Sequence, residues 1–483
     1  MASSVHNISC PQVTCLADSG LQSHILFPSD SEYNTCEESY FSNTAKLKPA
    51  CIVRPVSPNQ VSTALKALVA ANGKFAIRSG GHAPLAGSNN ISGGVTIDLS
   101  LLNNIRYDST SNTVSFGPGV RWKHVYHEVQ KHGRVVAGGR EGETGVAGLL
   151  LGGGNTWMTA RKGFACDNVI AFEVVLADGR IVTADQSTHT DLFRALKGGS
   201  NNFGIVIDFT MITIPCEHVW GGSTASPKEC IPDAIQITED FTRGVREHPE
   251  SSIITLISHI PLVKDVVVGA ALVETQGLEN APAFEEWSKL PKIFDTTKIR
   301  SMLDMVLDTA LPYGHYNTWF TLTVKNDKRI MFKAAEVHDK LVEEIKSYIP
   351  DGSFTTQCIF QPLPLVFAQH SAAFGGNVLG LERNTSDGIL LLMNTMVTTL
   401  DQREFAYPKV KACIQAIKEY AATIDGGLLD WVYLNYADES QDVLGSYGAA
   451  NVEFMKAVSA RYDPQQVFQY LCPGGFKLVD VTL

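Results

Sequence analysis

Short apolar stretches separated by glycine-rich or polar turns fill roughly the first 215 residues of the chain. Such stretches predict strands, and apolar positions at helical spacing that end at a glycine predict helices. The predicted strands are CIVRP (51–55), KFAIRSGGH (74–82), GVTIDLS (94–100), TVSFGPG (113–119) and IVIDFTMITIP (205–215). A polar turn separates the third of these strands from the fourth. The predicted helices span residues 61–73, 122–133 and 191–199. Residues 168–184 predict a hairpin, because Asp178-Gly179 supplies the positive φ that its turn requires.

The pattern changes near Cys216. Strands such as SIITLISHI, VVVGAALVE, WFTLTV and ILLLMNTMV alternate there with long amphipathic helices such as 332–349. This alternation predicts a sheet covered on one face by helices, and therefore an α+β domain. Near the end, LDWVYLNYAD (429–438) predicts a strand and NVEFMKAVSARYD (451–463) a helix.

The length of 483 residues exceeds what one core usually supports, so two domains are expected. A formal net charge of −11 argues against a nucleic-acid partner. No apolar stretch is long enough to span a bilayer, so no membrane association is expected. The first residues lack a signal-peptide pattern, which leaves the compartment open between a cytoplasmic protein and a secreted or vesicular one whose signal was removed.

Three glycine-rich segments stand out: RSGGH (78–82), GGREGETGVAGLLLGGGNTW (138–157), and GFACDN (163–168) with the downstream LFRALKGGSNNFG (192–204). Dense glycine lets backbone N–H groups approach a bulky anion such as a pyrophosphate. None of these segments contains a GxGxxG or P-loop fingerprint. Taken singly, each segment also fits tight turns at a crowded domain junction.

In this order the segments closely resemble the FAD-binding domain of the vanillyl-alcohol-oxidase superfamily, and in particular the fungal berberine-bridge-enzyme-like branch. The C-terminal NYAD…YG…RYDPxxVF is similar to the terminal signature of that branch. The resemblance implies an α+β, two-domain FAD-linked oxidase. Its FAD-binding domain of the PCMH type would span residues 1–215, and its substrate domain 216–430, with an antiparallel sheet covered by helices. Residues 431–483 would return to the FAD-binding domain.

The resemblance implies that His82 bonds covalently to the flavin 8α carbon, whereas the alternative is a histidine that only caps the turn. Matching the glycines places Glu141 where some members carry a second, cysteinyl link, so one covalent bond is expected and not two. The cofactor-binding residues expected from the motifs are His82, Arg78, Ser79, Gly80, Gly81, Pro118, Gly119, Gly138, Gly139, Thr144, Gly145, Gly148, Gly152, Gly153, Asn155, Asn168 and Asn435.

Thr144 matches the position that resembles the oxygen gate of the family. Because threonine has the size of valine, oxidase behaviour is favoured over dehydrogenase behaviour. Tyr433 matches the substrate-facing tyrosine of a Tyr-x-Asn element and is the first candidate for the base. On a strand, Tyr433 and Asn435 would face one side, and Leu434 and Tyr436 the other. Glu382 is the second candidate, two residues beyond the position of the glutamate that serves the namesake branch.

The expected function is removal of a hydride from a small organic substrate, an alcohol, amine or natural-product intermediate, with dioxygen as electron acceptor and hydrogen peroxide as product. Oxidative cyclisation fits the same chemistry. A carbohydrate oxidase and a non-redox cyclase or binding scaffold are the alternatives. The apolar character of the second-half strands slightly favours a lipophilic substrate. His124 and His127 lack a third ligand, so no metal is expected.

Overall fold

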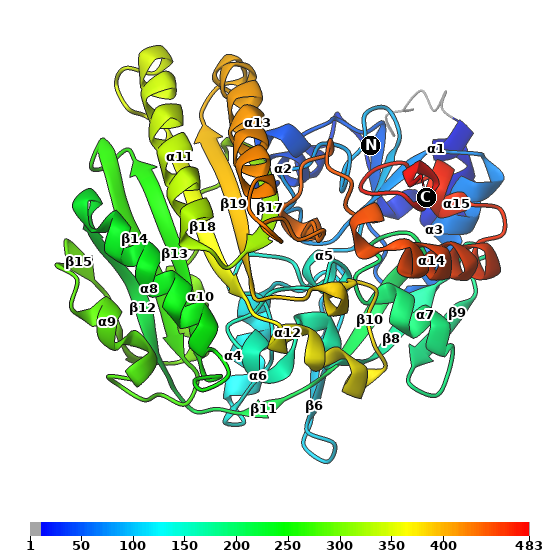
Figure 1. Ribbon diagram of the computed structural model, residues 1–483. Helices are drawn as coiled ribbons and strands as arrows, with labels where there is room; N and C mark the ends of the chain where they lie inside the picture. Colours follow the sequence, from blue (N-terminus) through cyan, green and yellow to red (C-terminus); the bar gives the residue numbers. More distant parts are fainter. Residues whose placement is uncertain (1–10, 483) are drawn as a thin grey trace.

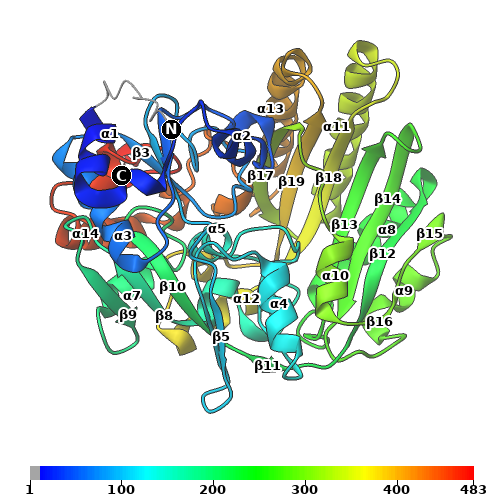
Figure 2. The same ribbon diagram turned by 180° about the vertical axis from the view of Figure 1, so that it is seen from behind.

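The computed structural model describes residues 11–482, and Figures 1 and 2 show its elements from opposite sides. The first sheet has four strands in the order β1-β2-β4-β3. Their bounds are β1 Ile25–Leu26, β2 Cys51–Val53, β4 Val95–Asp98 and β3 Phe75–Arg78. β2 and β3 both run parallel to β4. The helix α3 (Pro58–Ala70) connects β2 to β3, as the sequence predicts, and Ser57 caps its first turn.

The second sheet has five antiparallel strands in the order β5-β6-β10-β8-β9. Their bounds are β5 Ile105–Asp108, β6 Thr113–Phe116, β10 Ile205–Ile212, β8 Val169–Val175 and β9 Ile181–Asp185. The β8–β9 hairpin confirms the prediction for residues 168–184, and Gly179 in its turn has a φ of +82°.

Two details of this region differ from prediction. The strands expected at 94–100 and 113–119 lie in different sheets, and β5 intervenes between them. The long strand expected at 205–215 ends at Ile212, and the short β11 (Ile214–Pro215) pairs separately with β7 (Arg134–Val135). The helices here are α4 Trp122–Gln130, α5 Val146–Leu151, α6 Thr159–Lys162 and α7 Thr190–Leu196.

The second half of the chain forms an eight-stranded sheet, in which seven strands follow the order β15-β12-β14-β13-β18-β19-β17 and β16 pairs with β12. Their bounds are β12 Val219–Pro227, β13 Ser251–Ile260, β14 Asp265–Glu274, β15 Phe294–Asp295, β16 Lys298–Arg300, β17 Tyr316–Lys325, β18 Thr355–Leu363 and β19 Gly388–Val397. Every described pairing in this sheet is antiparallel.

Helices cover one face of this sheet, as Figure 1 shows for α8 (Ile231–Gly244), α11 (Lys328–Tyr348) and α13 (Leu400–Ala422). The apolar stripe of α11, which includes Ile330, Ala334, Leu341 and Ile345, is buried. The shorter helices of this half are α9 Glu285–Ser288, α10 Met302–Asp308 and α12 Val366–Gln369. The architecture confirms the expected α+β class with an antiparallel sheet covered by helices.

The strand predicted at 429–438 is wrong. Leu428 makes one bridge to Val324 of β17, and the chain then turns into a 3-10 helix at Leu434–Tyr436. Further pairing is blocked because the side-chain amide of Gln441 occupies the β17 edge: it accepts from Thr321 N at 3.1 Å and donates to Thr321 O at 2.7 Å.

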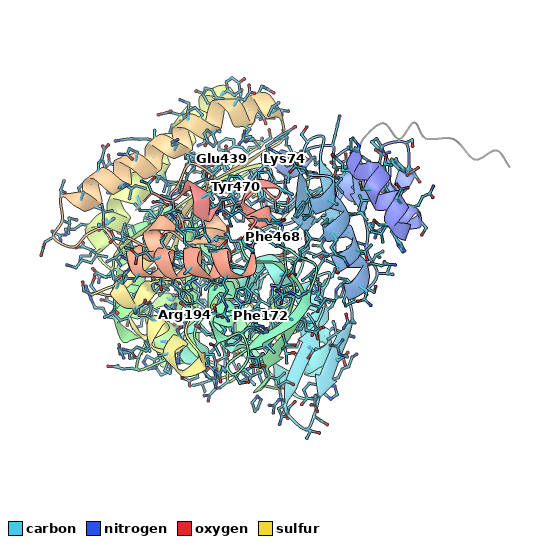
Figure 3. The ribbon with its side chains drawn as sticks, turned by 90° about the vertical axis from the view of Figure 1, so that its right-hand side faces the viewer. Lys74, Phe172, Arg194, Glu439, Phe468 and Tyr470 are labelled. Carbon is cyan, nitrogen blue, oxygen red and sulfur yellow. The ribbon has the colours of Figure 1, made fainter. Side chains whose placement is uncertain are left out.

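The rest of the chain packs on the N-terminal half through α14 (Ala449–Tyr462) and α15 (Val467–Tyr470). The Phe468 ring meets the Phe75 ring edge to face at 6.3 Å. Arg194 of α7 donates to Asn451 of α14 at 2.7 Å. Figure 3 views this side, with Phe468 and Arg194 labelled. No helix within residues 11–482 is long and apolar enough to cross a membrane.

Candidate active site

Two of the glycine-rich segments meet backbone to backbone. A Cβ atom added to Gly80 would lie 2.5 Å from the Cα of Gly145, and one added to Gly145 would lie 2.5 Å from the backbone nitrogen of Gly80. The Ser79 hydroxyl donates to the carbonyl of Pro118 at 2.5 Å, and Gly81 turns the chain with a φ of +68°. The predicted segments are therefore brought together, with His82 at their junction.

The remaining predicted glycines have two kinds of surroundings. Gly119, Gly138, Gly139, Gly152 and Gly153 are packed against other protein atoms, among them the Trp122 ring next to Gly138 and Gly139 and the Asn435 amide next to Gly152. Gly148 faces open space. Close packing explains most of these glycines without a ligand, whereas Gly148 leaves room where a cofactor could approach the backbone.

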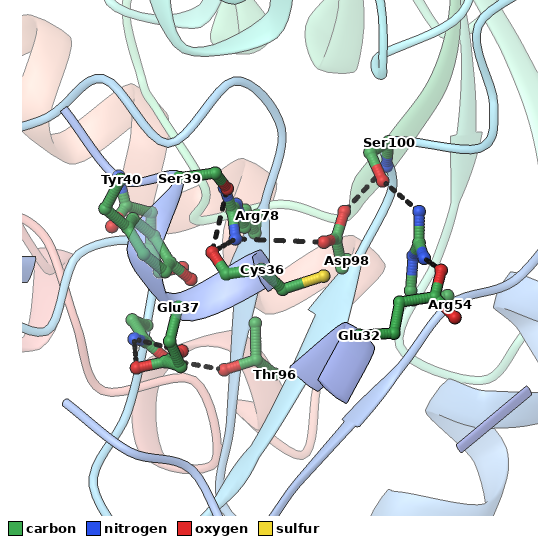
Figure 4. Close-up of polar contacts among 12 residues, drawn as sticks. Glu32, Cys36, Glu37, Ser39, Tyr40, Arg54, Arg78, Thr96, Asp98 and Ser100 are labelled. Carbon is green, nitrogen blue, oxygen red and sulfur yellow. Dashed lines mark hydrogen bonds and ion pairs between the residues drawn. The ribbon is translucent and has the colours of Figure 1, made fainter. Parts of the chain in front are cut away.

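The Arg78 side chain makes its contacts within the protein. Its guanidinium donates to Cys36 O at 2.7 Å and to the Ser39 hydroxyl at 2.5 Å, lies 3.9 Å from Asp98, and covers the Tyr40 ring (Figure 4). These contacts tie β3 to α2 (Ser31–Glu38). The side chain therefore connects the turn before His82 to α2, and a contact of Arg78 with a cofactor stays a prediction.

His82 is held between aromatic rings. Its imidazole stacks on Phe41, with ring centroids 4.1 Å apart, and meets Tyr313 edge to face at 6.1 Å. Burial, reinforced by the nearby Arg121 charge, lowers the pKa of His82 to about 3. The ring is therefore neutral at physiological pH, as a nucleophilic imidazole must be. Its Nε2 is buried and has no hydrogen-bond partner within residues 11–482.

Glu141 and Thr144 lie next to this ring. The Thr144 hydroxyl donates to Glu141 Oε2 at 2.7 Å, and the same oxygen lies 3.5 Å from His82 Nε2. Burial raises the pKa of Glu141. Cys166 is fully buried in the turn before β8, and burial raises the pKa of its thiol well above the ordinary value.

A second cluster surrounds the Tyr433 hydroxyl. It accepts from the backbone N–H of Asn155 at 2.7 Å and from the side-chain amide of Asn435 at 3.1 Å. The Asn435 amide also donates to Leu149 O at 3.2 Å, which ties the 3-10 turn to α5. Burial raises the pKa of Tyr433, and the Tyr436 phenol adds to the effect. The predicted pair therefore meets, although on a 3-10 turn and not on a strand.

Tyr436 joins the same cluster, contrary to the strand-based prediction that it faces away. The two phenol rings meet edge to face at 4.8 Å, since residues three apart share one side of a 3-10 turn. The Tyr436 hydroxyl accepts from Arg140 Nη2 at 2.8 Å and from Gln361 Nε2 at 3.3 Å. Neither Arg140 nor Gln361 was predicted from the sequence. For Arg140, the available signal was an arginine within the glycine-rich segment GGREG.

Two other predicted residues lie outside this cluster. Glu382 is exposed on the 3-10 turn Leu381–Arg383, whereas a base that removes a substrate proton must reach a protected site, so this position does not favour Glu382 as the base. The Asn168 amide donates to Lys162 O and Phe164 O at 2.9 Å each, so it stabilises the turn before β8.

The open face of the eight-stranded sheet completes the site. Trp319 on β17 meets both Tyr436 and Phe41, at 5.8 and 6.0 Å between ring centroids, so its face of the sheet is turned toward His82. Asn394 lies directly opposite Trp319 on β19 and donates to Gln357 on β18 at 3.0 Å. Trp319 Nε1 and Asn394 Oδ1 are buried without a hydrogen-bond partner among the described residues.

A cavity beside these clusters is lined in part by Arg140, Asn155, Trp157 and Gln361. A larger groove of about 660 Å³ between α8 and α9 contains none of the predicted residues. Within residues 11–482 no group of three His, Cys, Asp or Glu side chains is arranged to hold a metal ion.

Comparison with known proteins supplies the family. Residues 49–185 match the model of an FAD binding domain. The chain is 36% identical over 475 residues to the FAD-dependent monooxygenase drtC of Aspergillus calidoustus, covering 97% of this chain and 90% of the relative. It is 32% identical to the bifunctional solanapyrone synthase of Alternaria solani, covering 95% and 87%.

The fold is also shared with solved structures. A xylooligosaccharide oxidase from Myceliophthora thermophila superposes with a TM-score of 0.77 at 18% identity, covering 95% of this chain and 98% of that one. Berberine bridge enzyme superposes with a TM-score of 0.74 at 16% identity, covering 95% and 97%. The family resemblance and the two-part fold are confirmed. The chain belongs to the berberine-bridge-enzyme-like FAD-linked oxidoreductases with a PCMH-type FAD-binding domain.

Proposed function

We propose that this chain is an oxidase that holds FAD covalently through His82, takes a hydride from a small organic substrate and passes the electrons to dioxygen. The observation that carries the proposal is a neutral, buried imidazole at the point where two glycine segments touch. Bound FAD would supply the hydride-accepting chemistry. The absence of any cysteine from residues 138–157 supports a single covalent link.

Within this proposal, Tyr436 receives the substrate proton. Its hydroxyl lies 2.8 Å from Arg140 Nη2, which places a permanent positive charge beside the oxygen on which negative charge would develop. Tyr433, the candidate from the sequence, is almost fully buried, whereas Tyr436 is half-buried and so keeps part of its surface accessible. We therefore assign Tyr433 to positioning Asn155 and Asn435.

Thr144 has the proposed role of leaving space for dioxygen. Its hydroxyl is bonded to Glu141, whose carboxylate lies 3.5 Å from His82 Nε2, so a small side chain with a held rotamer lies near the proposed flavin link. Stopped-flow mixing of the reduced protein with air tests this role. Reoxidation within seconds and stoichiometric hydrogen peroxide are expected, whereas a flavin that stays reduced for minutes would contradict it.

The covalent bond and the redox role are tested separately. Acid precipitation of the purified protein should leave the yellow colour in the pellet, and peptide mapping should find the flavin on His82. Anaerobic addition of candidate alcohols, amines and polyketide-like intermediates should bleach the flavin. Turnover of a substrate without bleaching would instead support a non-redox cyclase.

A carbohydrate oxidase is the second candidate, and the sheet face favours it. Polar side chains, namely Gln361, Asn394 and Gln357, face the site where the sequence indicated apolar strands, and Trp319 offers both a ring and an unused N–H donor. Bleaching by oligosaccharides but not by lipophilic alcohols would select this candidate. Two of the fungal relatives are named FAD-dependent monooxygenases, so monooxygenation is a further reaction to test. Incorporation of oxygen from labelled dioxygen into the product would reveal it.

A further inference from the structure

Glu141 is a nearly buried carboxylate that accepts hydrogen bonds from its own turn, at Glu143 and Thr144, but forms no ion pair with a lysine or arginine among residues 11–482. One oxygen, Oε2, accepts from the Thr144 hydroxyl, and the other, Oε1, is buried without a hydrogen-bond partner within residues 11–482. Two cationic side chains of this region, Lys123 and Arg121, both contact the neighbouring Glu143. A buried carboxylate that lacks a paired cation costs stability and is more often kept for function.

The atom that Glu141 faces is a nitrogen of the proposed flavin-linking residue. Glu141 Oε2 lies 3.5 Å from His82 Nε2, and both side chains are nearly buried, at 13% and 12% exposure. The stack on Phe41 holds the plane of the imidazole, and within that plane Nε2 is the ring nitrogen beside the carboxylate. This arrangement leaves Nδ1 as the nitrogen available for bonding.

We propose that Glu141 orients His82 and accepts the Nε2 proton during covalent attachment of FAD. This role rests on the proposed bond at His82. Glu141 is thus a positioning residue and proton acceptor for the modification of the protein itself, at the position where some family members carry a second link to the flavin.

The attachment step forms one bond and releases two protons and two electrons. The lone pair of His82 Nδ1 forms a bond to the flavin C8α carbon, which loses one proton, and the imidazole loses its Nε2 proton to Glu141. The two electrons set free pass to the flavin ring and from it to dioxygen, which becomes hydrogen peroxide with the two protons. The pKa of Glu141 is raised by burial, so its carboxylate is a stronger proton acceptor than a surface glutamate.

Glu141→Gln tests the role, because it keeps the size and the contact with Thr144 but cannot take a proton. The readout is the rate at which protein produced under riboflavin starvation incorporates added FAD into the acid-precipitated pellet. We expect a decrease on the order of a hundredfold, the usual size of a proton-transfer contribution, while FAD still binds non-covalently. Glu141→Asp, with a carboxylate at shorter reach, should be intermediate.

Glu143→Gln is the matched control, since Glu143 lies in the same turn but contacts Lys123 and not His82. It should incorporate FAD at the wild-type rate. Equal rates for Glu141→Gln and wild type, or equal losses in Glu141→Gln and Glu143→Gln, would overturn the role of Glu141 and leave the His82 bond standing. Release of all flavin from the wild-type protein in acid would overturn the His82 bond itself, and with it this role.

Discussion

The two sides of the candidate site are built from different chemical groups. On the side of the glycine segments the backbone defines the surface, since Gly80 and Gly145 approach so closely that neither tolerates a Cβ atom. On the side of the eight-stranded sheet, side chains define the surface: Trp319, Asn394 and Gln361 project from neighbouring strands.

This difference indicates which side of the site suits a cofactor and which side suits a substrate. A backbone surface suits a cofactor, because every backbone N–H offers the same donor and glycine removes the obstacles to approach. A side-chain surface suits a substrate, because each residue changes shape and polarity independently. We therefore expect substitutions on the glycine side to affect folding and flavin content, and substitutions on the sheet side to affect substrate preference.

The largest effect is expected for Tyr436→Phe, at the boundary of the two sides. Removing the proposed base should slow anaerobic flavin reduction by about 10²–10⁴-fold, while the flavin remains bound. Tyr433→Phe should slow it by only about tenfold, since Tyr433 acts through Asn155 and Asn435. Stopped-flow absorbance measures both rates. A larger decrease in the rate for Tyr433→Phe than for Tyr436→Phe would instead support Tyr433 as the base, as the sequence suggested.

Gly145→Ala should cost about 1–3 kcal/mol of unfolding free energy, because the new methyl group would collide with the Gly80 backbone. The φ of −70° at Gly145 suits alanine, so the loss would be purely steric. Urea unfolding of the flavin-loaded protein measures it. Gly244→Ala is the control, since Gly244 lies at the end of α8, outside the predicted cofactor residues, and faces open space; a comparable loss there would contradict the distinction.

Asn394→Leu should raise KM for a hydroxyl-bearing substrate about tenfold, with a smaller change in kcat, because a buried hydrogen-bond acceptor is lost. Steady-state oxygen consumption provides both constants. Thr395→Val is the matched control: residue 395 is the next along β19 and faces the helices on the opposite side of the sheet. Equal effects of the two substitutions would show that the sheet face does not select the substrate.

The smallest effect is expected from pH. With a pKa lowered to about 3, His82 is neutral throughout the range near neutrality and contributes no pH dependence to flavin attachment. The pKa of Glu141 is raised, so its carboxylate is protonated earlier than an ordinary one as the pH falls. The attachment rate should therefore decrease several-fold toward acid pH, and in Glu141→Gln this decrease should vanish. A decrease that persists in Glu141→Gln would point to another group.

Local chemistry in the sequence was enough to predict the glycine segments, the turn before His82, the β8–β9 hairpin and the helix-covered sheet. These features depend on residues close together in the chain: glycine permits tight approach, and apolar periodicity selects strand or helix. Arg78 shows the limit of such reasoning. The motif contains it, yet its side chain is used by Cys36, Ser39 and Asp98, and nothing in the motif reveals those partners.

Tertiary structure alone decided which side chains meet. Residues 429–438 have the alternation of a strand, but Gln441 occupies the edge that a strand would need, so a 3-10 turn brings Tyr436 beside Tyr433. The same holds for Arg140 with Gln361, 221 positions apart, and for Glu141 with His82. The physical reason is that backbone preferences are local, whereas the partner of a buried polar side chain depends on which distant segment packs against it.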